Sequence, residues 1–224
     1  MNKKTNKKDI LLSIQNASYK YSDAEKDEYA LKSVSYDFEK GKLYAIRGRS
    51  GTGKTTLLSL ISGLERCTEG KVIFDGKDLK NINLDYYRSH DIGIVFQSYN
   101  LLPFMTASEN IILSMDASGI KIDNKKEEAL RLMKSVGLKE TYANRKVLRI
   151  SGGEQQRVAI ARSLSYNPKM IIADEPTGNL DKQTEKEILE IFKKLAHEEG
   201  KCVIIVTHSP NVCEVADEVY DLKK

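Results

Sequence analysis

A glycine-rich stretch near residue 50 carries the first chemistry that this sequence indicates. It fits the pattern G-x-x-x-x-G-K-[ST] between a strand-like run, 43–46, and a helix-like run, 56–64. Glycines let backbone N–H groups converge on phosphate oxygens, and the positive end of the following helix points to the same place. We therefore predict a phosphate-binding loop, in which Lys54 reaches the outer phosphates and the Thr55 hydroxyl binds Mg²⁺. A glycine-rich turn that binds nothing is the alternative. The predicted loop comprises Gly48, Arg49, Ser50, Gly51, Thr52, Gly53, Lys54 and Thr55, followed by Thr56.

Polar groups that follow apolar, β-branched runs are expected beside this loop. They are Gln97, Asp174, Glu175 and His208. In parallel sheets ligands bind beyond the carboxyl ends of the strands, so these side chains should meet at one edge. Asp174 suits a Mg²⁺ partner, and Glu175 suits a general base for water, a role worth about 10² to 10⁴ in rate. His208 can bond a terminal phosphate and the attacking water, and the Gln97 amide can contact metal and water. An acidic pair that serves solubility and a structural histidine are the alternatives.

A second glycine motif begins at Ser151. Ser151 and Glu154 form a capping box, and Gly152 and Gly153 leave the N–H groups of the helix start open to an anion. Two phosphate-binding helix ends are more than one nucleotide pocket needs. The sequence therefore suggests that they bind opposite sides of a nucleotide held between two chains.

A parallel sheet is expected to position these groups. The runs 92–96, 170–173 and 203–206 are continuously apolar, as strands covered on both faces are, and we expect them at the sheet centre. Upstream, 12–21 and 29–38 alternate with a period of two residues. That pattern predicts an opening antiparallel hairpin.

Between two of the apolar runs the pattern is helical, with capping boxes that begin at Thr106 and Ser151. We expect an inserted helical subdomain at about residues 98–165, within one domain of residues 1–224. A crossover helix is predicted at 181–199. The predicted fold class is therefore α/β, with a mostly parallel central sheet, an N-terminal antiparallel β subdomain and an inserted α-helical subdomain.

The composition is that of a soluble globular chain. Of 224 residues, 40% are hydrophobic and 30% charged, and no apolar run approaches the roughly 18 to 20 residues of a spanning helix. The net charge of +4 is too small to indicate a nucleic-acid partner. A basic tail, residues 1–9, is expected to be flexible, with attraction to an anionic membrane as the alternative. Three cysteines at no metal-like spacing and the lack of an export signal predict a reduced, cytosolic protein.

The ordered motifs resemble those of the nucleotide-binding subunit of an ATP-binding cassette (ABC) transporter, over nearly the whole chain. The resemblance implies the P-loop ABC ATPase fold, ATP and Mg²⁺ as cofactors, and ATP hydrolysis. It implies a head-to-tail homodimer in which 151–154 of one chain close over ATP held by the loop of the other. It also implies that Tyr21 stacks on adenine. The motifs that carry the resemblance are the phosphate loop, Gln97, Ser151 to Glu154, Asp174-Glu175, Asn179-Leu180-Asp181 and His208. The resemblance implies that the catalytic residues are Lys54, Gln97, Glu175 and His208, that the metal ligands are Thr55, Gln97 and Asp174, and that Asp181 contacts the nucleotide.

Within this family, the stretches 100–110 and 175–181 are similar to those of the subgroup for lipoprotein release, macrolide and peptide export, and bacterial cell division. That subgroup works with a separate integral membrane permease. The resemblance thus implies a cytoplasmic subunit, peripheral on the inner face of the membrane, that powers export or membrane extraction of a lipoprotein, peptide or drug-like amphiphile. A signalling module that acts on a membrane partner without transport is the alternative. A role in translation or DNA repair is disfavoured.

Three residues depart from the family pattern. Arg47 stands where an aliphatic residue usually precedes the first glycine, Ile150 replaces leucine, and Ser209 follows His208 where aspartate is frequent. None of these removes a predicted catalytic group, but the charge of Arg47 is left unexplained. Because the chain ends at Lys224, soon after the last expected strand, no C-terminal regulatory domain is expected.

Overall fold

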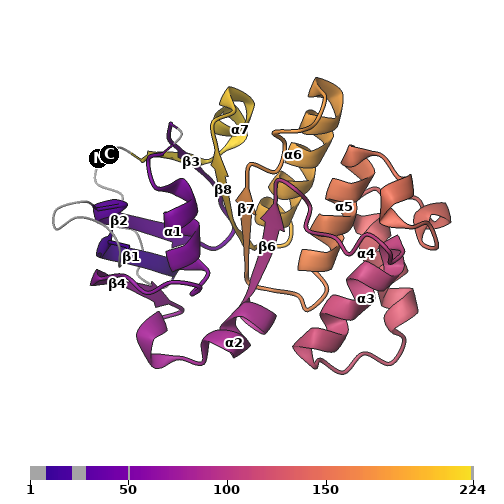
Figure 1. Ribbon diagram of the computed structural model, residues 1–224, viewed down its shortest axis with the longest axis horizontal. Coiled ribbons are helices and arrows are strands. Elements are labelled where there is room, and N and C mark those ends of the chain that lie inside the picture. Colours follow the sequence, from indigo (N-terminus) through magenta and orange to yellow (C-terminus); the bar gives the residue numbers. More distant parts are fainter. Residues whose placement is uncertain (1–8, 22–28, 50, 223–224) are drawn as a thin grey trace.

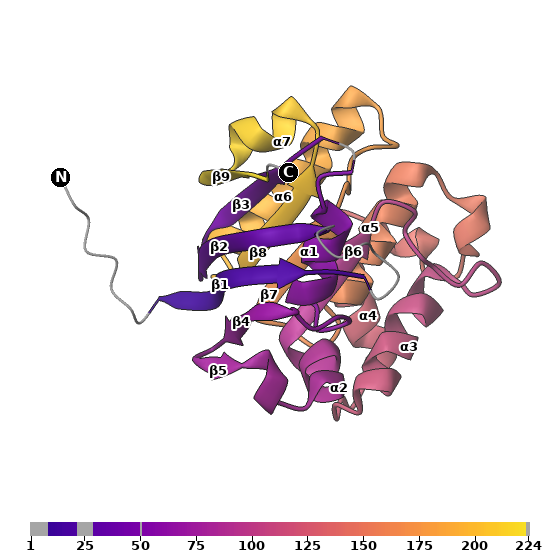
Figure 2. The same ribbon diagram turned by 60° about the vertical axis from the view of Figure 1, so that its left-hand side comes forward.

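The computed structural model describes residues 9–21, 29–49 and 51–222. The predicted basic tail therefore lies outside the described residues except for its last position, and so does Ser50 of the phosphate loop. Two sheets lie side by side, and helices cover the larger one (Figures 1 and 2). The first sheet lies at one end of the molecule and the helices of the inserted segment at the other (Figure 1).

The first sheet is antiparallel and has the strand order β2-β1-β4-β5. Its strands are β1 (Ile10–Tyr19), β2 (Leu31–Glu39), β4 (Glu69–Phe74) and β5 (Lys77–Asp78). The pairing of β1 with β2 confirms the predicted antiparallel hairpin. In β2, apolar residues alternate with exposed polar ones, whereas β1 is buried at most of its positions, including the consecutive Leu11 and Leu12.

The second sheet is parallel and has the order β6-β7-β8-β3-β9. Its strands are β3 (Leu43–Arg47), β6 (Ile92–Phe96), β7 (Met170–Asp174), β8 (Cys202–Thr207) and β9 (Glu218–Asp221). All of their carboxyl ends point to one edge, which is the edge where sequence predicts the chemistry.

Helical elements complete the chain. Between β6 and β7, in the segment predicted to be helical, the structure has α3, η3, η4, α4 and α5 and no strand. The crossover helix α6 lies within the predicted range, and Asp181 caps it. The bounds are α1 (Lys54–Ile61), η1 (Leu79–Asn81), α2 (Leu84–Tyr86), η2 (Tyr87–Asp91), α3 (Ala107–Ser118), α4 (Lys125–Ser135), η3 (Glu140–Tyr142), η4 (Val147–Arg149), α5 (Gly152–Ser163), α6 (Lys182–His197) and α7 (Pro210–Val215).

The placement of β6 corrects one prediction. Its apolar run was expected at the sheet centre, but β6 is an edge strand. It is nevertheless mostly buried, because α5 and η2 pack against it. A side chain at Gly93 would come within 2.5 Å of the Ser163 carbonyl oxygen, so glycine allows the end of α5 to lie against this strand. Helix cover therefore explains an apolar strand at an edge.

The bounds of α1 correct a second prediction, because the helix ends three residues before Leu64. Gly63 has a left-handed conformation with φ of 67°, which terminates the helix. Leu64 then lies outside the helix with 61% of its surface exposed. A side chain at Gly63 would approach Leu84 to 2.9 Å, so the turn is also closely packed.

The parallel sheet separates two hydrophobic clusters. On β3, Leu43 and Ala45 face the cluster formed with α3 to α6, whereas Tyr44 and Ile46 face the cluster that contains α1 and the antiparallel sheet. Successive side chains point to opposite faces of a strand, so a strand covered on both faces must be apolar at every position. This confirms the interpretation of the continuously apolar runs as strands buried on both sides.

Aromatic rings join the two sheets. Tyr36 and Phe38 of β2 pack with Tyr44 of β3 and Tyr220 of β9, and the contacting rings within this group of four have centroid distances of 4.6 to 6.3 Å. Most of these pairs have stacked or edge-to-face geometry, which is favourable for aromatic rings. The Tyr220 hydroxyl also donates a hydrogen bond to the Asp37 carbonyl oxygen at 2.8 Å. These contacts hold the first sheet against the edge of the second.

Candidate functional site

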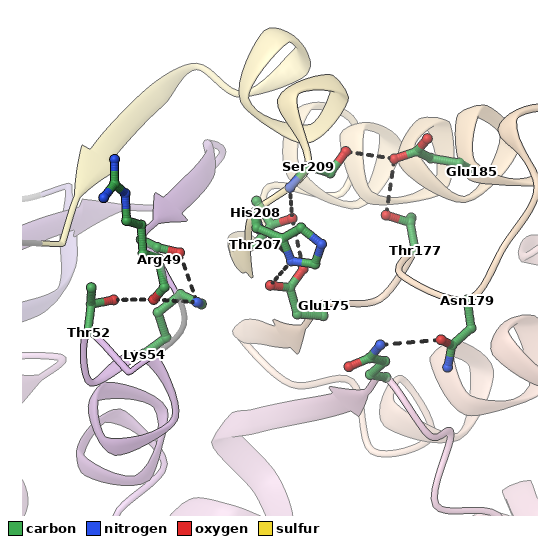
Figure 3. Close-up of polar contacts among 12 residues, drawn as sticks. Arg49, Thr52, Lys54, Glu175, Thr177, Asn179, Glu185, Thr207, His208 and Ser209 are labelled. Carbon is green, nitrogen blue, oxygen red and sulfur yellow. Dashed lines mark hydrogen bonds and ion pairs between the residues drawn. The ribbon is translucent and has the colours of Figure 1, made fainter.

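The phosphate loop follows β3 and leads into α1, as predicted. Lys54 Nζ donates hydrogen bonds to the carbonyl oxygens of Gly48 and Arg49 at 2.9 and 3.1 Å. Thr52 Oγ1 donates to the same Arg49 oxygen at 2.9 Å (Figure 3). The loop is thus folded around the lysine ammonium.

Two of the loop glycines are required by their surroundings. A side chain at Gly48 would lie 2.4 Å from Thr52 Oγ1. Gly53 has φ of 90°, and a side chain there would lie 2.3 Å from the Ala30 carbonyl oxygen. Since no other residue fits both the conformation and the space at Gly53, the turn before α1 depends on glycine. The loop is therefore packed against the start of β2 in addition to following β3.

Asp174 ends β7, beside the ends of its neighbours in the sheet. Burial raises the pKa of this carboxyl, the nearby Glu175 carboxylate adds to the rise, and the Lys54 ammonium opposes it. The residues described contain no cluster of three histidine, cysteine or acidic side chains that suits a metal ion. Mg²⁺, however, commonly binds through one or two protein oxygens, phosphate oxygens and water. The carboxylate of Asp174, the exposed hydroxyl of Thr55 and the exposed amide of Gln97 are donors of that kind.

Glu175 and His208 are in direct contact across the ends of β7 and β8. Glu175 Oε1 lies 2.6 Å from His208 Nδ1. Its Oε2 accepts hydrogen bonds from Thr207 Oγ1 at 3.1 Å and from the His208 backbone N–H at 3.2 Å (Figure 3). The Glu175 side chain is 12% exposed, whereas that of His208 is 71% exposed. One partner is thus fixed by the fold and the other faces solvent.

The backbone at Glu175 is strained. Its φ of 45° lies in the left-handed region, where a residue with a side chain is uncommon, and its N–H donates to the Val206 carbonyl oxygen at 2.9 Å. Strain of about 1 to 3 kcal/mol persists only where the surrounding structure imposes it. Here it turns the carboxylate toward His208 at the end of the strand.

Gln97 contacts the segment that follows Glu175. Its Nε2 donates to Asn179 Oδ1 at 3.3 Å (Figure 3). A side chain at Gly178 would come within 2.9 Å of the same Gln97 nitrogen, so the Gln97 side chain lies close to the backbone at Gly178. The end of β6 is therefore tied to residues 175–181.

The predicted capping box at the start of α5 is present. The Ser151 N–H donates to Glu154 Oε2 at 2.7 Å, and the Glu154 N–H donates to Ser151 Oγ at 3.3 Å. Side chains at Gly152 and Gly153 would come within 2.9 Å of the Tyr99 hydroxyl and 2.5 Å of Thr184. The paired glycines therefore also allow close packing, which the sequence did not indicate.

The two glycine motifs lie on different sides of the parallel sheet. Helix α1 contributes Leu57 and Ile61 to one hydrophobic cluster, whereas α5 contributes Val158 and Ile160 to the other. The helix start at Ser151 and the phosphate loop thus approach the carboxyl-end edge of the parallel sheet, here called the reactive edge, from opposite faces of the sheet.

Tyr21 follows β1 and reaches the start of α1. Its hydroxyl lies 3.1 Å from Thr56 Oγ1, and its ring packs edge to face against Tyr19. The Tyr21 side chain is 49% exposed. Its ring therefore lies beside the phosphate loop and is open to solvent.

Asp181 caps the start of α6, at the residue where the crossover helix was predicted to begin. Its carboxylate accepts hydrogen bonds from the N–H groups of Gln183 and Thr184, both at 3.0 Å, and from Thr184 Oγ1 at 2.6 Å. The bond from the Thr184 hydroxyl holds the pKa of this carboxyl below its usual value. Asp181 thus stabilises the start of α6.

The charge of Arg47 has a structural explanation. Its Nε and Nη2 donate to the two oxygens of Asp221 at 2.7 and 3.1 Å, across the pairing of β3 with β9. This ion pair raises the pKa of Arg47. The strand β9 was not among the predicted elements, and without it the partner of Arg47 is not evident. The same residues line a cleft of about 700 Å³ together with Gly48, Arg49, Thr52, His208 and Leu222.

Several residues near the site were missed by sequence reasoning. They are Thr177, Glu185, Thr207 and Ser209, which hydrogen-bond to one another or to Glu175. One signal was present, since Glu185 lies one helical turn before Ile188 on the apolar face of α6, where a carboxylate needs partners.

Comparison with known proteins identifies the family. Residues 31–178 match the family model described as ABC transporter. The chain belongs to the ABC transporter family. The ABC transporter ATP-binding protein YclH of Bacillus subtilis is 47% identical over 207 residues, 92% of this chain and 91% of YclH. The lipoprotein-releasing system ATP-binding protein LolD of Francisella tularensis is 39% identical, over 96% of this chain and 94% of LolD.

A solved structure supports the same family. The post-hydrolysis dimer of the ATP-binding cassette MJ0796, bound to ADP and Pi, matches with a TM-score of 0.87 and 38% identity, over 95% of this chain and 94% of that chain. The predicted ABC ATPase fold and the predicted family are thus confirmed. The chain is an ABC ATPase that binds ATP.

Proposed function

We propose that two copies of this ABC ATPase enclose two Mg-ATP and that their closure drives a separate membrane permease. The observation that carries the proposal is the contact of the Glu175 carboxylate, whose side chain is 12% exposed, with His208 at the sheet edge beside the phosphate loop. In this proposal the pair faces the terminal phosphate and the attacking water of a nucleotide held by the loop.

Within one site, the loop of residues 48–55 binds the phosphates, and Lys54 neutralises charge on the outer ones. Thr55, Asp174 and Gln97 hold Mg²⁺, and Thr56 lies in the first turn of α1 behind them. When bound, the metal ion stabilises the charge that develops on the transferred phosphoryl group. The exposed ring of Tyr21 stacks on the adenine.

Glu175 accepts the proton of the attacking water in this proposal. The His208 Nδ1 contact and the two donors to Oε2 fix the orientation of its carboxylate. The exposed His208 ring faces the terminal phosphate. A base fixed by the fold contributes to rate because its reorientation is not needed at the moment of reaction.

The second half of each site comes from the partner copy. The capped helix start of residues 151–154 presents backbone N–H groups and the positive end of α5, which suits an anion. This helix start and α1 lie on opposite faces of the parallel sheet. In this proposal it therefore binds the nucleotide of the partner copy and not the nucleotide held by the loop of its own chain. A head-to-tail pairing brings the two together, and the dimer of MJ0796 with ADP and Pi supports this arrangement. Asp181 lies at the same interface.

The permease is proposed to dock on the helical subdomain, about residues 98–165 of a single domain of residues 1–224. This segment exposes the large apolar side chains Leu102, Phe104, Leu113 and Leu148, of which Phe104 is 82% exposed. Exposed apolar side chains gathered on one segment indicate a protein partner. None of the helices in the described ranges is long and apolar enough to cross a membrane. In this proposal the chain is cytoplasmic and lies at the inner face of the membrane because it is bound to its permease.

The likeness to LolD supports a lipoprotein as the substrate of the complex. A peptide or another drug-like amphiphile also belongs to the proposed class of substrates. The substrate would be bound by the permease. No nucleic-acid partner is proposed.

The test replaces Glu175 with glutamine. We expect this variant to bind Mg-ATP and to accumulate as a dimer, with kcat lowered at least about 10²-fold because the base is lost. Glu190→Gln is the matched control, since Glu190 pairs with Lys193 on the exposed side of α6. Rapid turnover by Glu175→Gln would remove the residue from its proposed role. A specific activity of the native chain that does not change with protein concentration would refute the shared site.

A further inference from the structure

A buried carboxylate lies behind the reactive edge. Glu185, in the first turn of α6, is 9% exposed. Its Oε1 accepts hydrogen bonds from Thr177 Oγ1 at 3.3 Å and from Ser209 Oγ at 2.9 Å (Figure 3). Its Oε2 accepts one from Asn211 Nδ2 at 2.8 Å. All three donors are neutral, and they come from two segments outside α6.

Such a group is costly to bury and is retained here by its partners. A buried carboxylate is destabilising unless it is hydrogen-bonded, and bonds to a charged acceptor are about twice as strong as neutral ones. The position in the first turn of α6 also favours a negative charge. Glu185 is therefore a strong acceptor that holds two separate segments against one helix.

Those two segments carry the proposed hydrolytic pair. Thr177 is two residues beyond Glu175, and Ser209 directly follows His208. The Ser209 N–H donates to Thr207 Oγ1 at 2.9 Å, and Thr207 Oγ1 donates to Glu175 Oε2. The segments thus meet twice, once at the pair itself and once at the Glu185 carboxylate.

We propose that Glu185 is a positioning residue that sets the separation and orientation of Glu175 and His208. The inference rests on the proposed function, since it concerns the same reaction. Glu185 touches neither member of the pair, and it acts through Thr177 and Ser209. The hydroxyl of Ser209 is the matching partner because it donates to the carboxylate.

The contact has a consequence for position 209. An aspartate there would place a second carboxylate at hydrogen-bond distance from Glu185, and two negative charges so close repel each other. Only one carboxylate fits between these two positions. With glutamine at position 185, however, an aspartate at 209 regains a donor, because the amide N–H₂ of glutamine donates hydrogen bonds.

The experiment measures steady-state ATP hydrolysis by Ser209→Asp, Glu185→Gln and the double variant in the full chain. Each single variant is expected to lower kcat about tenfold or more, with KM for ATP within about twofold of the native value, because the loop and its binding groups are unchanged. The double variant is expected to recover kcat to within about threefold of the native value. Melting temperatures are measured alongside, with Glu190→Gln on the exposed side of the same helix as the control.

Two results would overturn the inference. One is native kcat in both single variants while Glu175→Gln is inactive, which leaves the proposed function intact. The other is a loss of kcat in the single variants that the double variant does not reverse, or a loss of kcat that only matches the unfolded fraction of each variant. Glu185 would then act through stability alone. If Glu175→Gln itself turns over like the native chain, the proposed function fails instead.

Discussion

Replacing Ser151 with alanine separates a stabilising role from a role in nucleotide binding, because α3 offers a matched control. Both helices begin with a full capping box. The bond from the cap N–H to the glutamate Oε2 is 2.7 Å at Ser151 and at Thr106, and the return bonds to Oγ and Oγ1 are 3.3 and 3.2 Å. Alanine removes the same hydrogen bond in each case.

The expected loss of stability is therefore similar for Ser151→Ala and Thr106→Ala. Loss of a serine or threonine cap costs about 1 kcal/mol, which lowers the melting temperature of a domain of this size by about 2 to 4 °C. Thermal unfolding followed by circular dichroism measures both shifts. ATP hydrolysis is then measured across a range of protein concentrations, well below the melting temperatures.

Only Ser151→Ala is expected to weaken hydrolysis, because Ser151 alone lies in the helix start proposed to close over the partner's ATP. We expect the specific activity of Ser151→Ala to rise at a protein concentration about 30-fold to 100-fold higher than that of Thr106→Ala, because one hydrogen bond of about 1 to 1.4 kcal/mol is lost at each of the two sites of the dimer. Equal activity of the two variants at every concentration would refute the reasoning, since Ser151 would then act only as a cap.

Three further variants test other features of the site. Asp181→Asn is expected to reduce the fall in melting temperature on acidification, because the hydrogen bond from Thr184 lowers the pKa of Asp181. The contribution of the Asp181 carboxylate to stability is present above its unfolded pKa of about 3.9 and is lost as the pH falls through its folded pKa. A melting temperature that falls as steeply with pH as that of the native chain between pH 5 and 2 would contradict this. Gly53→Ala is expected to abolish nucleotide binding in a calorimetric titration and to lower the melting temperature by several degrees, given a left-handed φ and a carbonyl oxygen 2.3 Å from the added carbon. Arg47→Leu is expected to keep kcat within about twofold and to change the melting temperature little, since the pair with Asp221 is half-exposed. A large loss of kcat would instead place that charge in the reaction.

Much of the site was predictable because its groups are tied to strand ends and to local backbone rules. The run before Asp174 is apolar at every position, so a strand covered on both faces was indicated, and its end had to lie at the reactive edge. The contact of Glu175 with His208 follows once β7 and β8 are neighbours. The capping box at Ser151 depends only on two residues three positions apart, and it was found as predicted.

The remaining features depend on contacts between distant segments. The burial of β6, although it is an edge strand, results from cover by α5, and no local sequence pattern contains that contact. The strand β9 has four residues and is defined by its pairing with β3, so its sequence alone is a weak signal. The partners of Glu185 lie 8 to 26 residues away in sequence and belong to separate turns. Such polar networks become visible only when the elements are placed together.

The aromatic contact between the two sheets has an optical consequence. The chain has no tryptophan, so tyrosine and phenylalanine dominate its near-ultraviolet circular dichroism. Tyr36, Tyr44 and Tyr220 are held in fixed relative orientations at the sheet junction, and such fixed packing is what produces a near-ultraviolet signal. The far-ultraviolet signal, in contrast, reports the helices and strands themselves. Detachment of the first sheet from the second can therefore be followed separately from loss of secondary structure, without a label.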